Sequence, residues 1–138
     1  MKKASILLIT LFLCSFAIAQ KADLTVNFKF LNVEPGYDHN TKCIVYIDGE
    51  MAGESQEAPQ TKGGNFKVSV PVGEHDLKVV NMALYDGTWE EHTIENNYSV
   101  DCIFEESHKF KKSEKLFLVF DLDSEMYTGW KKAPKVKK

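Results

Sequence analysis

Apolar and polar residues alternate with a period of two along most of the chain after residue 20. Residues 24–30 and 65–70 show the alternation most clearly, and residues 116–122 form the most apolar run. Alternation is typical of half-buried strands, because successive side chains of a strand point to opposite faces of its sheet. After residue 20, no stretch of ten or more residues has the 3.6-residue apolar spacing of an amphipathic helix. The pattern therefore predicts an all-β protein.

Turn residues separate the predicted strands. Asp48-Gly49 and Asp86-Gly87 are typical of two-residue hairpins, because Gly accepts a positive φ and Asp tolerates one. Pro71 and Gly73 mark another reversal. Strands at spacings of about 8–12 residues predict an antiparallel β-sandwich of about seven or eight strands, Ig-like or transthyretin-like. We expect further strands at 42–48, 50–55, 75–85 (with a bulge or a bend), 88–94 and 98–104. The charged residues 105–113 are expected to form a turn with a short strand around Phe110.

Residues 1–19 have the features of a secretory signal peptide. Lys2 and Lys3 precede an apolar core at 6–16, and a small-x-small cleavage site at 17–19 leaves Gln20 as the mature N-terminus. The apolar core is shorter than the roughly 20 residues of a membrane span, so no transmembrane segment is expected after cleavage. The prediction is a secreted or periplasmic protein, with an uncleaved signal anchor as the alternative.

Cys14 raises the further alternative of a lipoprotein. Lipid-modified cysteines are similar to one another in following a small residue, whereas Leu13 is large, so a free exported form is favoured. Residues 20–130 then make one β-sandwich domain, long enough for a core of its own. The lysine-rich residues 131–138 are expected to form a disordered tail, with docking on an anionic surface as the alternative.

The charge balance of the predicted domain is acidic. The whole chain has 17 basic and 20 acidic residues. Subtracting Lys2, Lys3 and the five lysines of the tail leaves 10 basic against 20 acidic residues, a net charge of −10. Nucleic-acid binding requires a basic face for the phosphates, so this balance argues against that class of function.

Two cysteines are left after cleavage, Cys43 and Cys102. Their places in the alternating pattern put both on the core side of their strands. Export to an oxidising compartment permits a disulfide between them, closing a loop of about 60 residues and contributing about 4 kcal/mol. Two buried free thiols are the alternative, because cysteine packs as a small apolar residue. Two cysteines are too few for a structural zinc site, and the sequence predicts no cofactor.

Residues 43–80 carry a recognisable pattern of strands and turns. A V-x-I-D-G strand and turn is followed by a glycine-bearing short strand and then by P-x-G-x-H-x-L-x-V. The matching residues are Val45, Ile47, Asp48, Gly49, Gly53, Pro71, Gly73, His75, Leu77 and Val79. The segment resembles a PEGA-type domain and, more broadly, transthyretin-like or carboxypeptidase-regulatory-like modules of exported bacterial proteins. The gap from Gly53 to Pro71 is longer than in the compact family pattern.

The resemblance implies a non-catalytic binding or structural module of the bacterial cell envelope, with an envelope protein or a glycan as its partner. It offers no catalytic residues to transfer, and no serine lies in a Gly-x-Ser-x-Gly context, so we expect no enzyme. The alternative is a small secreted hydrolase or inhibitor-like protein using the acidic surface. An enzyme predicts a cleft where carboxylates or a histidine converge.

Aromatic residues are the main candidates for ligand binding, because exposed rings bind sugar faces and protein partners. Tyr85 and Trp89 flank the Asp86-Gly87 turn, and the outer strand faces add Tyr46 and Phe117. If the strands of Tyr46 and Phe117 are neighbours, an apolar patch forms from Ile44, Tyr46, Phe117 and Val119. The alternative role for tryptophan is closing the open ends of the sandwich, which would use Trp89 and Trp130.

Carboxylates and histidines provide the remaining candidates. On an extended strand the carboxylates of Asp121, Asp123 and Glu125 would share one face, which makes them a candidate Ca²⁺ site. A solvated acidic strand end is the alternative. His75 lies at a turn and is expected to hydrogen-bond a loop carbonyl, whereas His92 and His108 are expected to be solvated.

Overall fold

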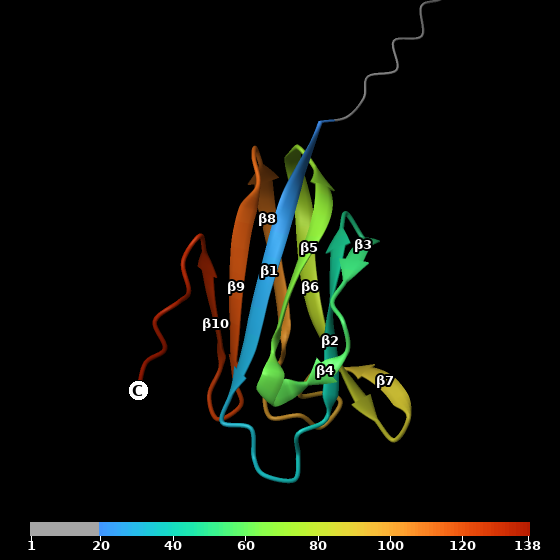
Figure 1. The fold of residues 1–138 in the computed structure, drawn as a ribbon, viewed down its shortest axis with the longest axis vertical. Coiled ribbons are helices and arrows are strands. Elements are labelled where there is room, and N and C mark those ends of the chain that lie inside the picture. Colours follow the sequence, from blue (N-terminus) through green and yellow to red (C-terminus); the bar gives the residue numbers. More distant parts are fainter. Residues whose placement is uncertain (1–19) are drawn as a thin grey trace, which may run out of the picture.

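Two β-sheets face each other in the structure, a computed structural model that describes residues 20–138 (Figure 1). The predicted signal peptide, with Cys14, lies outside the described residues. The first sheet has the order β10-β9-β1-β5. Its strands are β1 (Lys21–Leu31), β5 (Gly64–Pro71), β9 (Glu114–Asp121) and β10 (Met126–Trp130). β1 and β9 run parallel, and the other neighbours run antiparallel.

The second sheet is built around β2 (Asn40–Ile47) and β6 (Gly73–Tyr85), and all its pairs are antiparallel. β3 (Glu50–Glu54) and β4 (Ala58–Pro59) share the free edge of β2, and the 3₁₀ turn η1 (Gln60–Lys62) follows β4. The free edge of β6 is shared by β7 (Thr88–Glu91) and β8 (Ile103–Phe110). The predicted all-β sandwich is confirmed. The described residues form ten strands rather than seven or eight, because β3 and β4 share one edge of this sheet and β7 and β8 share the other.

The core lies between the sheets and contains the residues that alternation places inward. β1, β5 and β9 supply one layer, and β2, β6 and β8 supply the other. Among the members of this cluster are Leu24, Val26, Phe28, Val45, Val70, Leu77, Val79, Leu116, Leu118 and Phe120. No helix within residues 20–138 is long and apolar enough to cross a membrane.

Both predicted hairpin turns are confirmed. Asp48 and Gly49 have φ values of 51° and 83° between β2 and β3, and the Asp86-Gly87 pair has 48° and 76° between β6 and β7. His75 Nδ1 lies 2.6 Å from Asp48 Oδ2, while its Nε2 lies 3.4 Å from the carbonyl oxygen of Val72. The predicted carbonyl contact of His75 therefore exists, but a carboxylate provides its shorter contact.

Several predicted strand boundaries are wrong. Residues 92–102, expected to be mostly strand, form a loop between β7 and β8. The charged segment 105–113 contains most of β8, where only a short strand around Phe110 was expected. β6 has no bulge, because the polar residue Asn81 takes an inward position while Met82 points outward. The register shift lies instead between β2 and β3, at Val45 and Tyr46.

The predicted tail contains no helix or strand. Its first residues turn back onto β10, so closely that a side chain at Gly129 would collide with the carbonyl oxygen of Lys132 and crowd Pro134. The start of the tail therefore packs against the domain.

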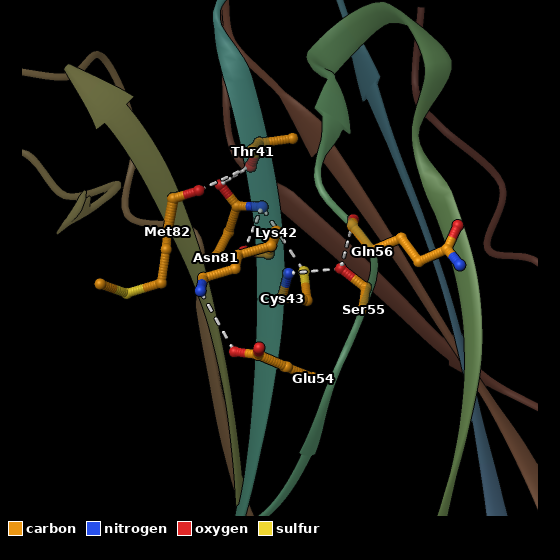
Figure 2. Close-up of polar contacts among 8 residues, drawn as sticks. All are labelled: Thr41, Lys42, Cys43, Glu54, Ser55, Gln56, Asn81 and Met82. Atoms are coloured by element: carbon orange, nitrogen blue, oxygen red, sulfur yellow. Dashed lines mark hydrogen bonds and ion pairs between the residues drawn. The ribbon is translucent and has the colours of Figure 1, made fainter. Parts of the chain in front are cut away.

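A cluster of buried polar side chains joins β2 to β6 (Figure 2). The Thr41 hydroxyl oxygen lies 2.8 Å from both Asn81 Oδ1 and the carbonyl oxygen of Met82. Asn81 Nδ2 lies 3.5 Å from Cys43 Sγ, and Ser55 Oγ accepts the Cys43 N–H at 2.9 Å. Thr41, Cys43 and Asn81 are fully buried. These contacts satisfy polar atoms that would otherwise lose their hydration without compensation.

Cys43, Asn81 and Cys102 form a row across adjacent chain segments. Cys43 is opposite Asn81 in the β2–β6 register, and the Asn81 N–H donates to the carbonyl of Cys102 at 2.9 Å. Segments two positions apart are separated by about 10 Å, beyond the Cα separation of about 7 Å that a disulfide tolerates. Both cysteines are free and buried. Of the two alternatives, the structure has the buried thiols and not the disulfide.

We expect two free thiols in residues 20–138 purified without reductant. Alkylation in denaturant should add two groups per chain, as measured by mass spectrometry. In the folded state the reaction should be slow, because burial raises the pKa of the Cys43 thiol to about 12 and also raises that of Cys102. A non-reduced chain that accepts no alkyl group would contradict the row geometry.

Thr41→Val should destabilise the fold by about 1–3 kcal/mol, because it removes the hydroxyl donor that serves the buried Asn81 Oδ1. The free energy of unfolding from urea titration measures this. Thr128→Val is the matched control, since Thr128 is exposed on β10, and should change stability by less than about 0.5 kcal/mol. Equal effects of the two substitutions would contradict the role of the buried network.

Candidate functional site

A pocket of about 670 Å³ lies at the end of the sandwich where β1 ends, the lower end in Figure 1. Its walls come from segments distant in sequence: the loop 32–39, η1, the β6–β7 hairpin, the loop 92–102 and the β9–β10 turn. The described chain begins at the opposite end, where β1 starts. Pockets of this size accommodate small ligands.

His92 lies inside this pocket and is 2% exposed. Its backbone N–H donates to the carbonyl of Asn81, and its carbonyl accepts the N–H of Cys102. Its ring stacks on Tyr98, with ring centres 4.2 Å apart, and lies 5.8 Å from the His39 ring. The prediction of a solvated His92 is wrong, because the chain leaves β7 at this residue and turns toward the core.

The two imidazoles have one satisfied and one unsatisfied nitrogen each. His39 Nδ1 lies 3.2 Å from the carbonyl oxygen of Tyr37, and His92 Nδ1 lies 3.5 Å from Gln60 Nε2. The Nε2 atoms of His39 and His92 are buried and have no hydrogen-bond partner. A buried polar atom without a partner costs about 1–3 kcal/mol, which makes this pair a candidate ligand contact.

The pocket favours neutral histidines in an acidic surrounding. Burial lowers the pKa of His92 to about 4 and also lowers that of His39. Carboxylates of Glu34, Glu90 and Asp123 line the pocket, whereas no lysine or arginine lines it. The Tyr98 hydroxyl donates to Glu90 at 2.7 Å, and burial together with this carboxylate raises the pKa of Tyr98.

Exposed aromatic rings border the same pocket. Tyr37 is 72% exposed and Tyr85 is 67% exposed, and both line it. Of the four predicted aromatic binding residues, Tyr85 is thus the one that lines this pocket. Tyr46 lines an open groove of about 690 Å³ on the outer face of the second sheet, and Trp89 packs its ring 4.6 Å from Lys42 Nζ.

Phe117 lies on β9 in the first sheet, away from Tyr46 on β2 in the second. The predicted apolar patch of Ile44, Tyr46, Phe117 and Val119 is therefore wrong. Strand order decides which outer faces adjoin, and alternation does not encode it.

The candidate Ca²⁺ site is also wrong. β9 ends at Asp121 and the chain turns, so Asp121, Asp123 and Glu125 do not continue one extended strand. Asp121 Oδ1 accepts hydrogen bonds from Asn32 Nδ2 at 2.7 Å and from the Asp123 N–H at 3.1 Å. Within residues 20–138, no group of three or more His, Cys, Asp or Glu side chains could hold a metal ion.

Trp130, at the end of β10, is partly buried against the core, whereas the alternative role for tryptophan had Trp89 and Trp130 close the open ends of the sandwich. Its ring stacks on His108 with centres 4.0 Å apart, and its Nε1–H donates to Glu106 at 2.9 Å. His108 Nε2 lies 2.6 Å from Glu114 Oε2, and the His108 side chain is 18% exposed. The prediction of a solvated His108 is wrong, because β10 and β8 come together there.

Sequence reasoning did not identify His39, Gln60 and Tyr98 as site residues. They come from three segments with no shared motif, and Gln60, in the polar segment between β4 and β5, is 1% exposed. The turn-forming Asn96-Asn97 pair, where Asn97 has a φ of 68°, was the available signal that a loop interrupts the strands here.

No protein-family model and no curated protein matches this chain. Among solved structures, the chain is similar to one titled "Crystal Structure of Gram Negative Toxin" at 3% identity, with a TM-score of 0.38, covering 81% of this chain and 23% of that one. Listeriolysin O matches at 11% identity, with a TM-score of 0.32 and coverage of 87% and 23%. Suilysin from Streptococcus suis matches at 12% identity, with a TM-score of 0.34, covering 87% of this chain and 24% of that one. The chain spans about a quarter of these structures, and at such TM-scores they carry no argument about function.

His92 should make the protein less stable in acid. Its pKa is about 4 in the folded state and 6.5 in the unfolded chain, so between these values only the unfolded chain binds the proton. Stability should fall from pH 6.5 to 4, by up to about 3 kcal/mol from this residue, with no contribution above pH 6.5. Urea unfolding at several pH values measures the slope, and His92→Gln should reduce it. An NMR titration of the His92 ring near pH 6.5 would contradict this.

Proposed function

We propose that the protein is a non-catalytic binding module, exported to the bacterial cell envelope, that holds its ligand in the end pocket. The resemblance of residues 43–80 to PEGA-like modules supports the envelope role, as does the predicted signal peptide. The partner is a component of the envelope, either a glycan or a protein.

The observation that carries this proposal is the pair of buried, unpartnered Nε2 atoms of His39 and His92. Both rings line a pocket bordered by the exposed rings of Tyr37 and Tyr85. A ligand that hydrogen-bonds the imidazoles would recover the free energy that their desolvation costs. Exposed tyrosines at the rim provide apolar contact area with a polar tip.

The pocket offers less support for the alternative of a hydrolase. Ser99 lines it, but its hydroxyl donates to the carbonyl of Leu122 at 2.7 Å rather than to a histidine. Activation of a serine nucleophile requires a base within hydrogen-bond distance of its hydroxyl. The acidic groove beside Tyr46 lies on an open sheet face, which excludes little water.

Tyr85→Ala should weaken retention on the envelope about fivefold or more, because it removes an exposed ring from the rim of the pocket. The measurement is co-sedimentation of residues 20–138, tagged at the N-terminus away from the pocket, with an envelope fraction of the source cells. Tyr46→Ala is the matched control, since Tyr46 lies on the outer face of the second sheet.

If retention depends on Tyr46 and not on Tyr85, the binding site is the groove on the outer face of the second sheet and not the end pocket. No retention of the unmodified chain on any envelope fraction would contradict the proposed function as a whole.

A further inference from the structure

We propose that the end pocket binds a neutral saccharide and that one sugar hydroxyl bridges His39 Nε2 and His92 Nε2. This inference rests on the proposed function and names the ligand class for the same pocket. It is argued from the hydrogen-bonding roles of the two imidazoles, from the charge of the pocket and from its exposed rings.

The partners of the Nδ1 atoms determine what each Nε2 atom can do. A carbonyl oxygen only accepts, so His39 Nδ1 carries the proton that it donates to Tyr37, and His39 Nε2 is left as an acceptor. The Gln60 amide nitrogen only donates, so His92 Nδ1 accepts and His92 Nε2 carries the proton. The two histidines of the pocket lining therefore hold one acceptor and one donor, both buried and without partners.

A hydroxyl group satisfies both nitrogens at once, because it donates one hydrogen bond and accepts others. The ring centres of His39 and His92 are 5.8 Å apart. Both Nε2 atoms are closed to solvent in the structure, so a hydroxyl reaches them only when the surrounding side chains part. It then bridges the two nitrogens with hydrogen bonds of about 2.9 Å. The two nitrogens are not hydrogen-bonded to each other, so the ligand breaks no hydrogen bond between them.

The charges and hydrogen-bonding groups of the pocket favour a hydroxyl over an anion, an ammonium group or a metal ion. Glu34, Glu90 and Asp123 line the pocket without lysine or arginine, which disfavours anions. An ammonium group has only donors and would leave His92 Nε2–H unpaired. A metal ion needs two bare nitrogens and further ligands, whereas residues 20–138 contain no group of three metal-binding side chains.

A sugar also fits the rest of the lining. The exposed rings of Tyr37 and Tyr85 can cover the apolar C–H face of a sugar ring. The side chains of Asn32, Asn96 and Asn97 lie in the same lining and offer both donors and acceptors to further hydroxyls. An apolar platform with a few convergent polar groups is the usual composition of a small-ligand site.

The first experiment distinguishes the two envelope partners with the co-sedimentation assay. Periodate oxidation of the envelope fraction, which cleaves vicinal diols, should abolish retention, and protease treatment should leave it intact. Retention that survives periodate but is lost after protease would overturn the saccharide while leaving the proposed binding function in place. No retention before either treatment would contradict both.

The second experiment tests the atoms. Residues 20–138 labelled with ¹⁵N are titrated at pH 7 with the neutral polysaccharide purified from the periodate-sensitive fraction. The ring nitrogens of His39 and His92 should shift together, each keeping its own tautomer. Shifts confined to other residues would overturn the bridging hydroxyl. Zn²⁺ alone, added in place of the polysaccharide, should leave both rings unchanged, and two zinc-shifted Nε2 signals would show a metal site instead.

Substitutions of His92 test whether its Nε2–H donates a hydrogen bond to the ligand. His92→Phe keeps a planar ring but loses the N–H, and should weaken polysaccharide binding about tenfold. His92→Gln retains an N–H donor near the same position and should recover part of the loss. His75→Gln, near the start of β6 at the opposite end of the sandwich, should bind like the unmodified chain. Equal binding by all three variants would overturn the role of His92, and urea unfolding confirms that each one is folded.

Discussion

The hydrogen bonds of Asn81 connect the core of the sandwich to its candidate site. Its backbone N–H donates to the carbonyl of Cys102, and its carbonyl accepts the N–H of His92. Both ends of the loop 92–102 are therefore hydrogen-bonded to the central strand β6. Its buried side chain contacts Thr41 and Cys43 on β2. A polar residue at the centre of an apolar sheet is costly unless every group is paired. Here that pairing joins β2, β6 and both ends of the pocket loop, which places His92 at the end of the core.

The histidines of this protein differ in whether their ring nitrogens have hydrogen-bond partners. This difference indicates where a ligand would bind. His75 and His108 each meet a carboxylate at 2.6 Å, and Trp130 both stacks and donates a hydrogen bond. By contrast, His39 and His92 retain a buried nitrogen without a partner. His75 and His108 thus each have a carboxylate partner, whereas the histidines of the end pocket have hydrogen-bonding capacity left for another molecule.

Local chemistry accounts for the parts of the fold that were predicted. The positive φ values of Asp48-Gly49 and Asp86-Gly87 come from turn residues that tolerate them, and the inward residues of β1, β5 and β9 follow the two-residue alternation. Prediction failed where a polar residue is buried. Asn81 was interpreted as part of an irregular strand, and His92 and His108 as solvated, because the partners that make their burial tolerable are distant in sequence.

The sequence alone determined that this is a two-layer β protein with tight hairpins and core-facing cysteines, because strand alternation and turn preference act between neighbouring residues. Only the tertiary structure decided which strands adjoin. That order separated Cys43 from Cys102 by the intervening Asn81, and Tyr46 from Phe117 by placing them in opposite sheets. It also brought His39, Gln60, His92 and Tyr98 together from distant segments. The physical reason is that contacts across the sandwich depend on how two apolar faces pack, which the pattern of one strand does not specify.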